Sequence, residues 1–213
     1  MIITGYILTY AYILSILLTS YLLHKMFKVR FIILRKFVHI AIAFVWVISY
    51  HYFGTTIHII VPPLSFVVIN FIAYQKNLFK WLDNRQSMGT VYYPLSVLIL
   101  AIITYFYPSF IYIYGIAVFC MGIGDGFAPL VASYVKSPVI TNNKTLAGTL
   151  TVCLSCLVVI LAFNIVFSLD YSIIKLMLVA GVATILELIG KDGLDNLYVP
   201  LGVALTVYLI GVI

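Results

Sequence analysis

The sequence carries little charge, and very little of that charge is acidic. Of its 213 residues, 8% are Asp, Glu, Lys or Arg, and only six are Asp or Glu. Soluble globular domains carry about 25% charged residues, whereas 64% of this chain is hydrophobic. This composition excludes an ordinary soluble domain and predicts a polytopic membrane protein. Because the apolar runs leave no room for a separate soluble unit, we interpret residues 1–213 as a single membrane domain.

Several motifs with well-known chemistry are absent. The sequence has no G-x-x-x-x-G-K-[ST] loop, no G-x-S-x-G elbow and no H-E-x-x-H. Their absence argues against P-loop nucleotide binding, hydrolase and zinc-protease functions. Cysteine is scarce, and the C-x-x-C of Cys153 and Cys156 has no second pair, so we interpret both as packing residues. The loops are short and have no dense basic run, which argues against nucleic acid as a partner.

Eight apolar runs are candidates for membrane-spanning helices. A helix needs about 20 apolar residues to cross a hydrocarbon core about 30 Å thick. The runs are continuous and do not alternate, which excludes a β-barrel, and the first has no basic segment or cleavage pattern, so we expect it to be retained as a span. We therefore predict an all-α integral membrane protein with about eight transmembrane helices. The runs are residues 3–23, 37–53, 56–74, 91–107, 109–122, 146–168, 173–189 and 198–213.

Positive charge is confined to alternate loops. Eleven of the twelve Lys and Arg residues follow the first, third, fifth and seventh runs, and only Lys175 lies in another loop. Under the positive-inside rule these loops, residues 24–36, 75–90, 123–145 and 190–197, are cytoplasmic and both termini are non-cytoplasmic. Five of the six acidic residues fall on the same face. The sequence therefore predicts a multi-pass protein of the cell membrane with polar chemistry at its cytoplasmic face.

The stretch GIGDGFAPL at residues 122–130 is the most specific of the polar segments. We interpret it as a loop in which Gly124 and Gly126 leave the backbone open to a phosphate or a metal ion. Asp125 between them is an expected ligand of Mg²⁺, which prefers oxygen donors. Lys136 and Lys144, further along the same loop, are expected phosphate ligands. The alternative is a glycine-rich connection with a solvated Asp.

A second acidic group follows the seventh apolar run. Glu187 lies near the end of that run, where an unpaired ionised carboxylate costs about 2.5 kcal/mol or more. Asp192, Asp195 and Asn196 follow within a span of ten residues. We predict that this group contributes to the site, with both Asp residues as metal ligands. The alternative is a Glu that reaches the membrane interface beside Lys191, with the two Asp residues as helix caps.

A basic cluster precedes the second run. Arg35 and His39 are four residues apart, which is one helical turn, and Lys36 is adjacent. Together they can converge on an anionic group, and His39 can carry or release a proton near neutral pH. A basic cluster at this place is also what membrane topology alone would produce.

Four segments in this order resemble the dolichol kinase and phytol kinase family of CTP-dependent membrane kinases, which is distantly related to the phosphatidate cytidylyltransferases. They are RKFVHI at 35–40, SMGTVYYPL at 87–95, GIGDGFAPLVASYV at 122–135 with NKTLAGTL at 143–150, and DNLYVPL at 195–201. The resemblance implies transfer of the terminal phosphate of a nucleoside triphosphate, CTP by expectation, to the hydroxyl of an isoprenoid or polyprenol alcohol. Mg²⁺ or another divalent cation is the implied cofactor.

The resemblance extends to individual residues. The family's Gly-Asp-Gly falls at residues 124–126, its Lys-x-x-x-Gly at Lys144 and Gly148, and its Asp-Asn at Asp195 and Asn196. Phosphoryl transfer needs a metal ion, cations for the phosphates and a positioned hydroxyl, and the residues divide accordingly. The predicted catalytic residues are Asp125, Glu187 and His39; the predicted nucleotide or phosphate ligands are Arg35, Lys36, Gly124, Gly126, Lys136, Lys144, Gly148 and Asn196; and the predicted metal ligands are Asp125, Asp192 and Asp195.

Two other functions stay open at this point. One is a cytidylyltransferase that makes a CDP-linked lipid. The other is a small transporter, in which Glu187, Asn70 and Asn164 would line the pathway, although the charges gather at one face and no inverted repeat is visible. The expected partners are a lipid alcohol, a nucleoside triphosphate and membrane lipids, with a homodimer as the oligomer to test. The length of the alcohol's tail is open.

Overall fold

The computed structural model describes residues 1–78, 88–141 and 144–211. Within them the chain is almost entirely helical, with one short antiparallel hairpin in which Val139 pairs with Thr145 and Thr141 with Lys144. The helices are α1 (Ile2–Phe27), α2 (Phe31–Ala43), α3 (Val45–Ile48), α4 (Val61–Gln75), α5 (Gly89–Phe106), α6 (Ile111–Tyr134), α7 (Leu146–Phe167), α8 (Ile173–Ile189) and α9 (Asp195–Gly211), with short turns η1 (Ser49–Phe53), η2 (Ile57–Ile59) and η3 (Pro108–Phe110), and the strands are β1 (Val139–Thr141) and β2 (Lys144–Thr145).

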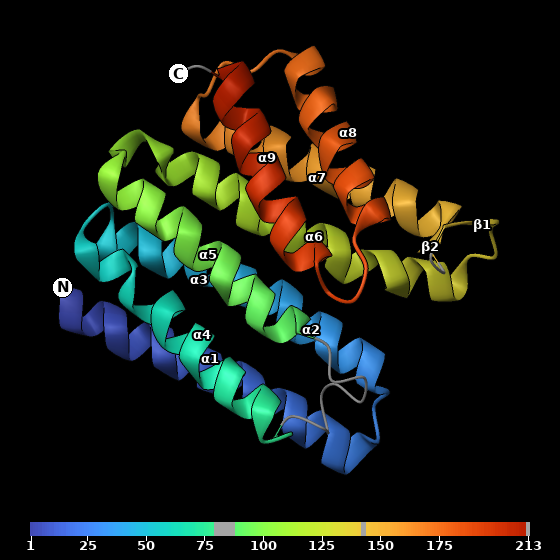
Figure 1. Ribbon diagram of the computed structural model, residues 1–213, viewed down its shortest axis with the longest axis horizontal. Helices are drawn as coiled ribbons and strands as arrows, with labels where there is room; N and C mark the ends of the chain where they lie inside the picture. The colour runs from blue at the N-terminus through green and yellow to red at the C-terminus, as the bar shows by residue number, and fades with distance from the viewer. Residues whose placement is uncertain (79–87, 142–143, 212–213) are drawn as a thin grey trace.

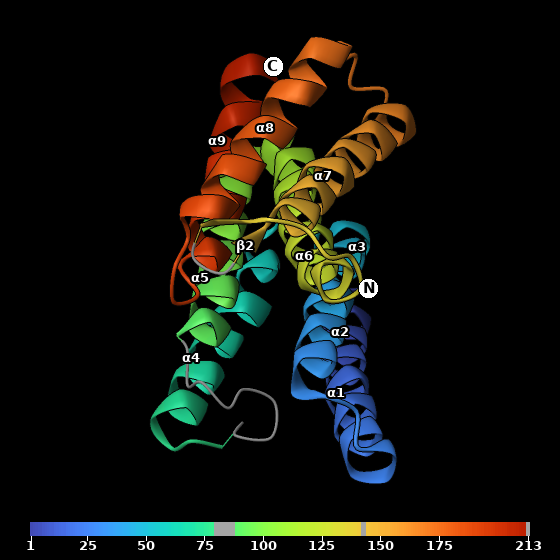
Figure 2. The same ribbon diagram turned by 90° about the vertical axis from the view of Figure 1, so that its right-hand side faces the viewer.

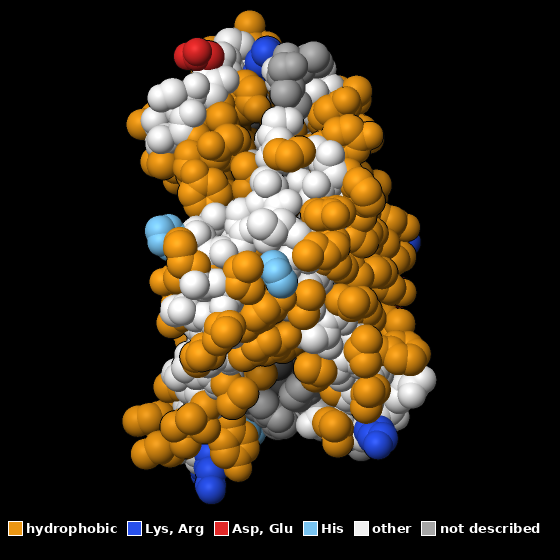
Figure 3. Space-filling view, turned by 90° about the vertical axis from the view of Figure 1, so that its left-hand side faces the viewer, with side chains coloured by type: hydrophobic (Ala, Val, Ile, Leu, Met, Phe, Trp, Pro, Cys, Tyr) orange, Lys and Arg blue, Asp and Glu red, His pale blue; other side chains and the backbone are white. Residues whose placement is uncertain are grey.

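The prediction of an all-α integral membrane protein is confirmed. Six helical segments in the described residues are long and apolar enough to cross a membrane, namely 2–27, 31–53, 57–75, 89–106, 108–134 and 146–167. The last two predicted runs fold as α8 and α9, of 17 residues each. Figure 3 shows hydrophobic side chains over most of one face of the molecule, as expected for a surface in contact with lipid. Three expectations stay predictions: the total of eight spans, the location of both termini on the non-cytoplasmic side, and the interpretation of residues 1–213 as a single membrane domain.

The long helices run back and forth along a common direction. In Figure 1 the two termini lie on the left and at the top, whereas α1, α6 and the hairpin β1–β2 extend toward the opposite end. At that end, which we call the polar end, the last turns of α1, α4, α6 and α8 meet the first turns of α2, α5, α7 and α9. The polar end therefore carries the segments that the sequence assigns to the cytoplasmic face.

Helix α6 lies at the centre of the bundle and packs against α2, α7 and α9. In the span that contains α6, residues 108–134, 61% of the most apolar stretch is buried inside the protein. The corresponding share is 22 to 44% in the other five spans. A helix that is buried over most of its length has no need of a polar face, and the buried part of α6 is accordingly apolar except at Asp125. This position makes α6 the element against which the site is built.

The prediction of a glycine-rich loop is wrong for residues 123–134, which continue α6. In a membrane the backbone polar groups must be satisfied within the segment, so the helix continues through the glycines although each disfavours it. The glycines allow close packing of neighbouring helices. A Cβ at Gly122 would lie 2.6 Å from the Cβ of Ala43, and one at Gly126 would lie 2.2 Å from Cγ1 of Ile40. Contacts of Gly124 and Gly126 with phosphate stay a prediction.

Two alanine substitutions in α6 separate packing from a role in the site. Gly126→Ala should lower the free energy of unfolding by about 1 to 3 kcal/mol, because Ile40 on α2 must move away. Gly124→Ala is the matched control, since its Cβ would meet Cys156 and Val152 at 3.5 Å, an ordinary contact. Thermal unfolding of both variants in detergent measures the difference. Equal melting temperatures would contradict the close approach of α2 to α6.

Candidate active site

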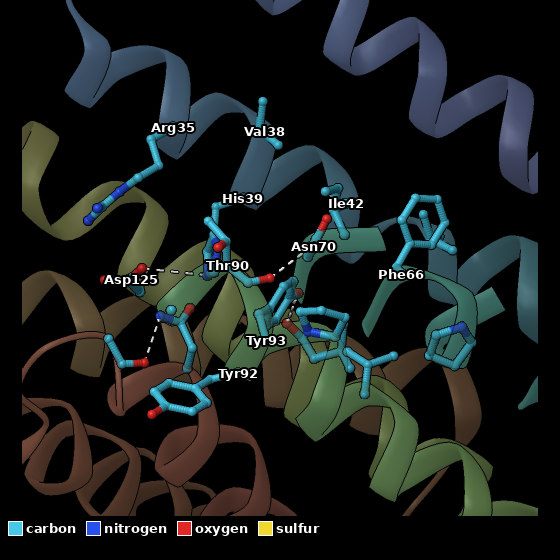
Figure 4. A pocket seen from close by; sticks show the side chains of 18 of the residues that line it. Arg35, Val38, His39, Ile42, Phe66, Asn70, Thr90, Tyr92, Tyr93 and Asp125 are labelled. Carbon is cyan, nitrogen blue, oxygen red and sulfur yellow. Dashed lines mark hydrogen bonds and ion pairs between the residues drawn. The ribbon is translucent and has the colours of Figure 1, made fainter. Parts of the chain in front are cut away.

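Charged side chains from five different elements meet at the polar end. Asp125 comes from α6, Glu187 from the last turn of α8 and Asp195 from the start of α9, while Lys36 comes from α2 and Lys144 from β2. These residues are far apart in the sequence, and the packing of α2, α8 and α9 around α6 brings them together. Figure 4 shows Asp125 facing His39 of α2, with Arg35 one turn away on the same helix.

The three carboxylates form one compact group. One oxygen from each of Asp125, Glu187 and Asp195 lies within 4.8 Å of the other two. Their side chains are 12%, 8% and 17% exposed, respectively. Like charges this close in a poorly solvated place repel one another strongly unless cations offset them. The group therefore requires either lysines or a metal ion beside it.

Two lysines supply that compensation in the structure. Nζ of Lys36 lies 2.6 Å from Oδ2 of Asp125. Nζ of Lys144 lies 2.7 Å from Oε1 of Glu187 and 3.8 Å from Oδ2 of Asp195, and it also donates to the backbone carbonyl of Glu187. Lys36 is only 4% exposed, which is unusual for a lysine without a partner and ordinary for a paired one. The charges thus form a buried network and not separate surface pairs.

His39 lies beside this network. Its Nε2 is 3.5 Å from Oδ2 of Asp125, and its ring packs against that of Tyr93 with the centroids 4.5 Å apart. Nε2 is buried and makes no hydrogen bond within the described residues. Buried polar atoms without a partner are uncommon, so this nitrogen is available to a group that enters the site.

A cavity of about 670 Å³ begins at this network. Its polar part is lined by Arg35, Lys36, His39, Asp125, Asp192, Asp195 and Asn196. The rest of its wall is mainly apolar and comes from α1, α2, α4, α5 and α6. The volume lies within the range of about 300 to 1,000 Å³ that is typical of small-molecule sites.

The structure brings most of the predicted site residues together. Arg35, Lys36, His39, Asp125, Lys144, Glu187, Asp195 and Asn196 either belong to the charged network or line the cavity. Asp192 lines the cavity but is exposed and lies outside the group of three carboxylates. Its backbone φ of 53° places it in the tight turn before α9. In the described residues, the group of carboxylates close enough to share a metal ion contains Glu187 and not Asp192.

Three predicted phosphate ligands lie elsewhere. Lys136 is exposed in the segment between α6 and β1. Gly148 is buried in the first turn of α7, where a Cβ would lie 3.3 Å from the carbonyl oxygen of Ala128 on α6, and Gly124 faces α7. Their roles stay predictions. Part of the predicted cytoplasmic loop 75–90 lies outside the described residues, including Lys80, Asp83, Arg85 and Ser87.

Two polar residues that suggested a transport pathway make structural hydrogen bonds. Asn164 bonds the backbone of Tyr171 in both directions, with its Oδ1 accepting from the amide and its Nδ2 donating to the carbonyl. Asn70 on α4 donates from Nδ2 to the carbonyl oxygen of Thr90 on α5 at 2.8 Å. Both contacts tie neighbouring segments together.

Tyr93 is a functional neighbour that the sequence did not identify. Its side chain is 5% exposed and packs on His39. Spacing is the sequence signal that could have identified Tyr93. Tyr93 and Val97 are four residues apart, so they lie on the same face of α5, and both line the cavity. Tyr93 restricts the orientation of the His39 ring toward Asp125.

The bond from Asn70 has a specific cause in the sequence. Pro94, inside α5, has no N–H group, so the carbonyl of Thr90 has no helical donor four residues later. Asn70 supplies the missing donor. Asn70→Ala should therefore lower the free energy of unfolding by about 1 kcal/mol, because the partly buried carbonyl of Thr90 loses its donor. In a Pro94→Ala background the same change should cost much less, and additive effects in this double-mutant cycle would contradict the explanation.

Comparison with known proteins yields a distant similarity. The chain is 35% identical over 129 residues to a phytol kinase of Synechocystis sp., and the match covers 57% of this chain and 54% of that protein. The chain thus spans about half the length of the curated relative it matches. No family model and no solved structure matches the chain. The similarity supports a likeness to kinases of isoprenoid alcohols and does not distinguish between members of that group.

Proposed function

We propose that the protein is a lipid kinase that transfers a phosphoryl group from a nucleoside triphosphate to the hydroxyl of an isoprenoid-type alcohol. CTP is the donor to test first. One observation carries the proposal: three buried carboxylates and two lysines form a charged network at the polar end of a largely apolar cavity. The network suits phosphates and a cation, and the cavity suits a lipid. The similarity to a phytol kinase points the same way.

The donor atoms fit a hard divalent cation. Mg²⁺ prefers carboxylate oxygens and holds them about 2.1 Å away, so two of its ligand atoms are at most about 4.2 Å apart. Neighbouring ligand atoms of an octahedral ion are closer, about 3.0 Å apart. The oxygens of Asp125, Glu187 and Asp195 lie within 4.8 Å of one another, so changes of about 1.8 Å or less in their separations suffice. When bound, the cation would offset the negative charge on the phosphates of the donor. We propose Mg²⁺ as the cofactor and these three residues as its ligands.

The basic residues are proposed to bind the donor phosphates. Lys36 and Lys144 pair with the carboxylates, and both become available to phosphate oxygens when the carboxylates have another counterion. Arg35 lines the same cavity and presents a planar guanidinium suited to two phosphate oxygens. These three cations offset the charge that develops during phosphoryl transfer.

His39 is proposed to receive the proton of the acceptor hydroxyl. Its Nε2 is buried and without a hydrogen-bond partner, and it lies 3.5 Å from Asp125. A general base must lie within hydrogen-bond reach of the proton that it takes. An acceptor hydroxyl located at the polar end of the cavity meets that condition.

A labelling experiment separates the kinase from the cytidylyltransferase. The purified protein is incubated with Mg²⁺, a panel of isoprenoid alcohols and CTP labelled at either the α or the γ phosphate. A kinase gives lipid product labelled from the γ position only. Product labelled from the α position would contradict the proposal and favour a CDP-lipid synthase. Replacing CTP with ATP tests the choice of donor. Asp170 is an exposed acidic residue between α7 and α8, so Asp170→Asn is a matched control for variants of the network.

The proposed location of the site is the cytoplasmic face. It is supported by the concentration of Lys and Arg in the segments at the polar end. Lys136→Cys introduces a thiol at an exposed position there. A membrane-impermeant thiol reagent should label it only when the cytoplasmic side is accessible. Labelling only from the outside would contradict the predicted orientation. The unsubstituted protein, with its three native cysteines, gives the background level of labelling.

A further inference from the structure

The cavity is long and narrow, and its wall changes character along its length. Its lining runs from Arg35, His39 and Ile42 on α2 to Trp46 on α3 and Ser49 at the start of η1, and these residues recur at the helical spacing of one face. The distance along the helix from Arg35 to Ser49 is about 21 Å at 1.5 Å per residue. On α4 the lining runs from Tyr74 to Pro62, about 18 Å. Figure 4 shows the same division, with Arg35, His39 and Asp125 on one side and Phe66 on the other.

The far end of the cavity is closed by contacts between α1, η1, η2 and α4. The hydroxyl of Tyr10 lies 2.9 Å from that of Ser65, and the ring of Tyr10 packs on Phe66. The hydroxyl of Tyr6 lies 2.9 Å from Nδ1 of His58, and its ring packs on Phe53, with centroids 4.9 Å apart. Toward the polar end α1 and α4 lie apart, on opposite sides of the view in Figure 2. The cavity thus has a closed apolar end and a polar end at the charged network.

The dimensions admit one extended chain. A volume of about 670 Å³ over a length of about 20 Å gives a mean cross-section of about 33 Å². An extended chain advances about 1.2 Å per bond, as the backbone of a polypeptide does. The helix rises about 15 Å from His39 to Ser49 and about 21 Å from Arg35 to Ser49. A cavity of this length therefore accommodates an extended chain of about 12 to 17 bonds.

We infer that this cavity holds the apolar tail of the acceptor and limits its length to about three to four isoprene units, each of which contributes four bonds to the main chain. The inference rests on the proposed function and adds what the sequence left open. The hydroxyl lies by His39 and Asp125, the chain lies along α2 and α4, and its end lies against Ser49 and Trp46. An alcohol of six or more units exceeds this length and must leave its end outside the cavity.

The first experiment shortens the cavity. Ser49→Phe fills the closed end, since Ser49 is 3% exposed and lines it. Val47→Phe is the matched control, because Val47 lies on the same helical segment, is 48% exposed and does not line the cavity. Phosphorylation of alcohols with two, four and ten isoprene units is compared. Ser49→Phe should lose at least about 10-fold in kcat/KM for the four-unit alcohol relative to the two-unit alcohol, whereas Val47→Phe should keep the wild-type ratio.

The wild-type protein provides a second test that does not depend on the variant's folding or on catalysis. A four-unit alcohol with a photoreactive group at the end of its tail should label α3, η1 or α4 near the closed end, in competition with unlabelled four-unit alcohol. Labelling there without any phosphorylation would leave this inference standing and contradict the proposed function. Three results would overturn the inference without contradicting the proposed kinase function. They are a wild-type preference for the ten-unit alcohol, an unchanged ratio of kcat/KM between the four-unit and two-unit alcohols in Ser49→Phe, and labelling of lipid-facing positions only.

Discussion

Asp125→Asn is expected to lower turnover by at least about 100-fold, a loss comparable with the removal of a main electrostatic stabiliser. The substitution keeps the size of the side chain and removes the charge at the centre of the network. It also leaves Lys36, which is 4% exposed, without its counterion. Removal of one member of a buried pair costs about 3 to 5 kcal/mol, and the lower value is expected here because the Asn oxygen still accepts a hydrogen bond from Lys36. Activity and stability should therefore both fall.

A second substitution separates the two effects. In Asp125→Asn with Lys36→Met both charges are absent, and an apolar replacement of a whole buried pair is often neutral or stabilising. The double variant should recover most of the lost stability and none of the activity. The measurements are a melting curve and the phosphorylation assay, with Asp170→Asn as the control for an acidic residue outside the network. Recovery of activity in the double variant would mean that Asp125 serves only as the counterion of Lys36.

Glu187→Gln is expected to abolish phosphorylation, again by at least about 100-fold, with little change in stability. The reason for the difference is Lys144. After the substitution this lysine still has Asp195 at 3.8 Å and the carbonyl oxygen of residue 187, so it is not left alone. The change also removes one of three mutually repelling carboxylates. The free energy of unfolding should stay within about 1 kcal/mol of the wild type or rise, as is common where a site holds charge at the expense of the fold.

The assay of one purified variant decides the role of Glu187. Full activity, whatever the melting temperature, would remove Glu187 from the site and leave Asp125, Asp192 and Asp195 as the acidic candidates. Glu187→Asp is a useful companion, because it keeps the charge and shortens the side chain by one methylene. A metal ligand should tolerate this change in part, and its activity should depend on the concentration of the divalent cation. A residue that only pairs with Lys144 would show no such dependence.

The sequence by itself determined the class of protein and the extent of most helices. In a membrane each span must satisfy its own backbone hydrogen bonds, so a continuous apolar run is enough to predict a helix. Alternation of the basic loops then predicted which ends of the helices lie together. For that reason Arg35, Lys36, His39, Asp125, Lys144, Glu187 and Asp195 could be assigned to one face of the molecule, where the structure brings them together.

The tertiary structure decided the pairing of these residues and the form of the cavity. Lys36 and Asp125 are 89 residues apart, and Lys144 and Glu187 are 43 apart; contacts over such distances depend on how helices pack and leave no local pattern. The glycines of α6 are helical although local propensity assigns them to a loop, because a membrane segment must satisfy its own backbone hydrogen bonds. Only the tertiary structure shows that Gly122 and Gly126 lie where α2 comes close to α6. The closed end of the cavity depends on bonds between α1 and α4 such as Tyr10 to Ser65. Local hydrogen bonding fixes the helices of this chain, whereas the contacts between helices create its site.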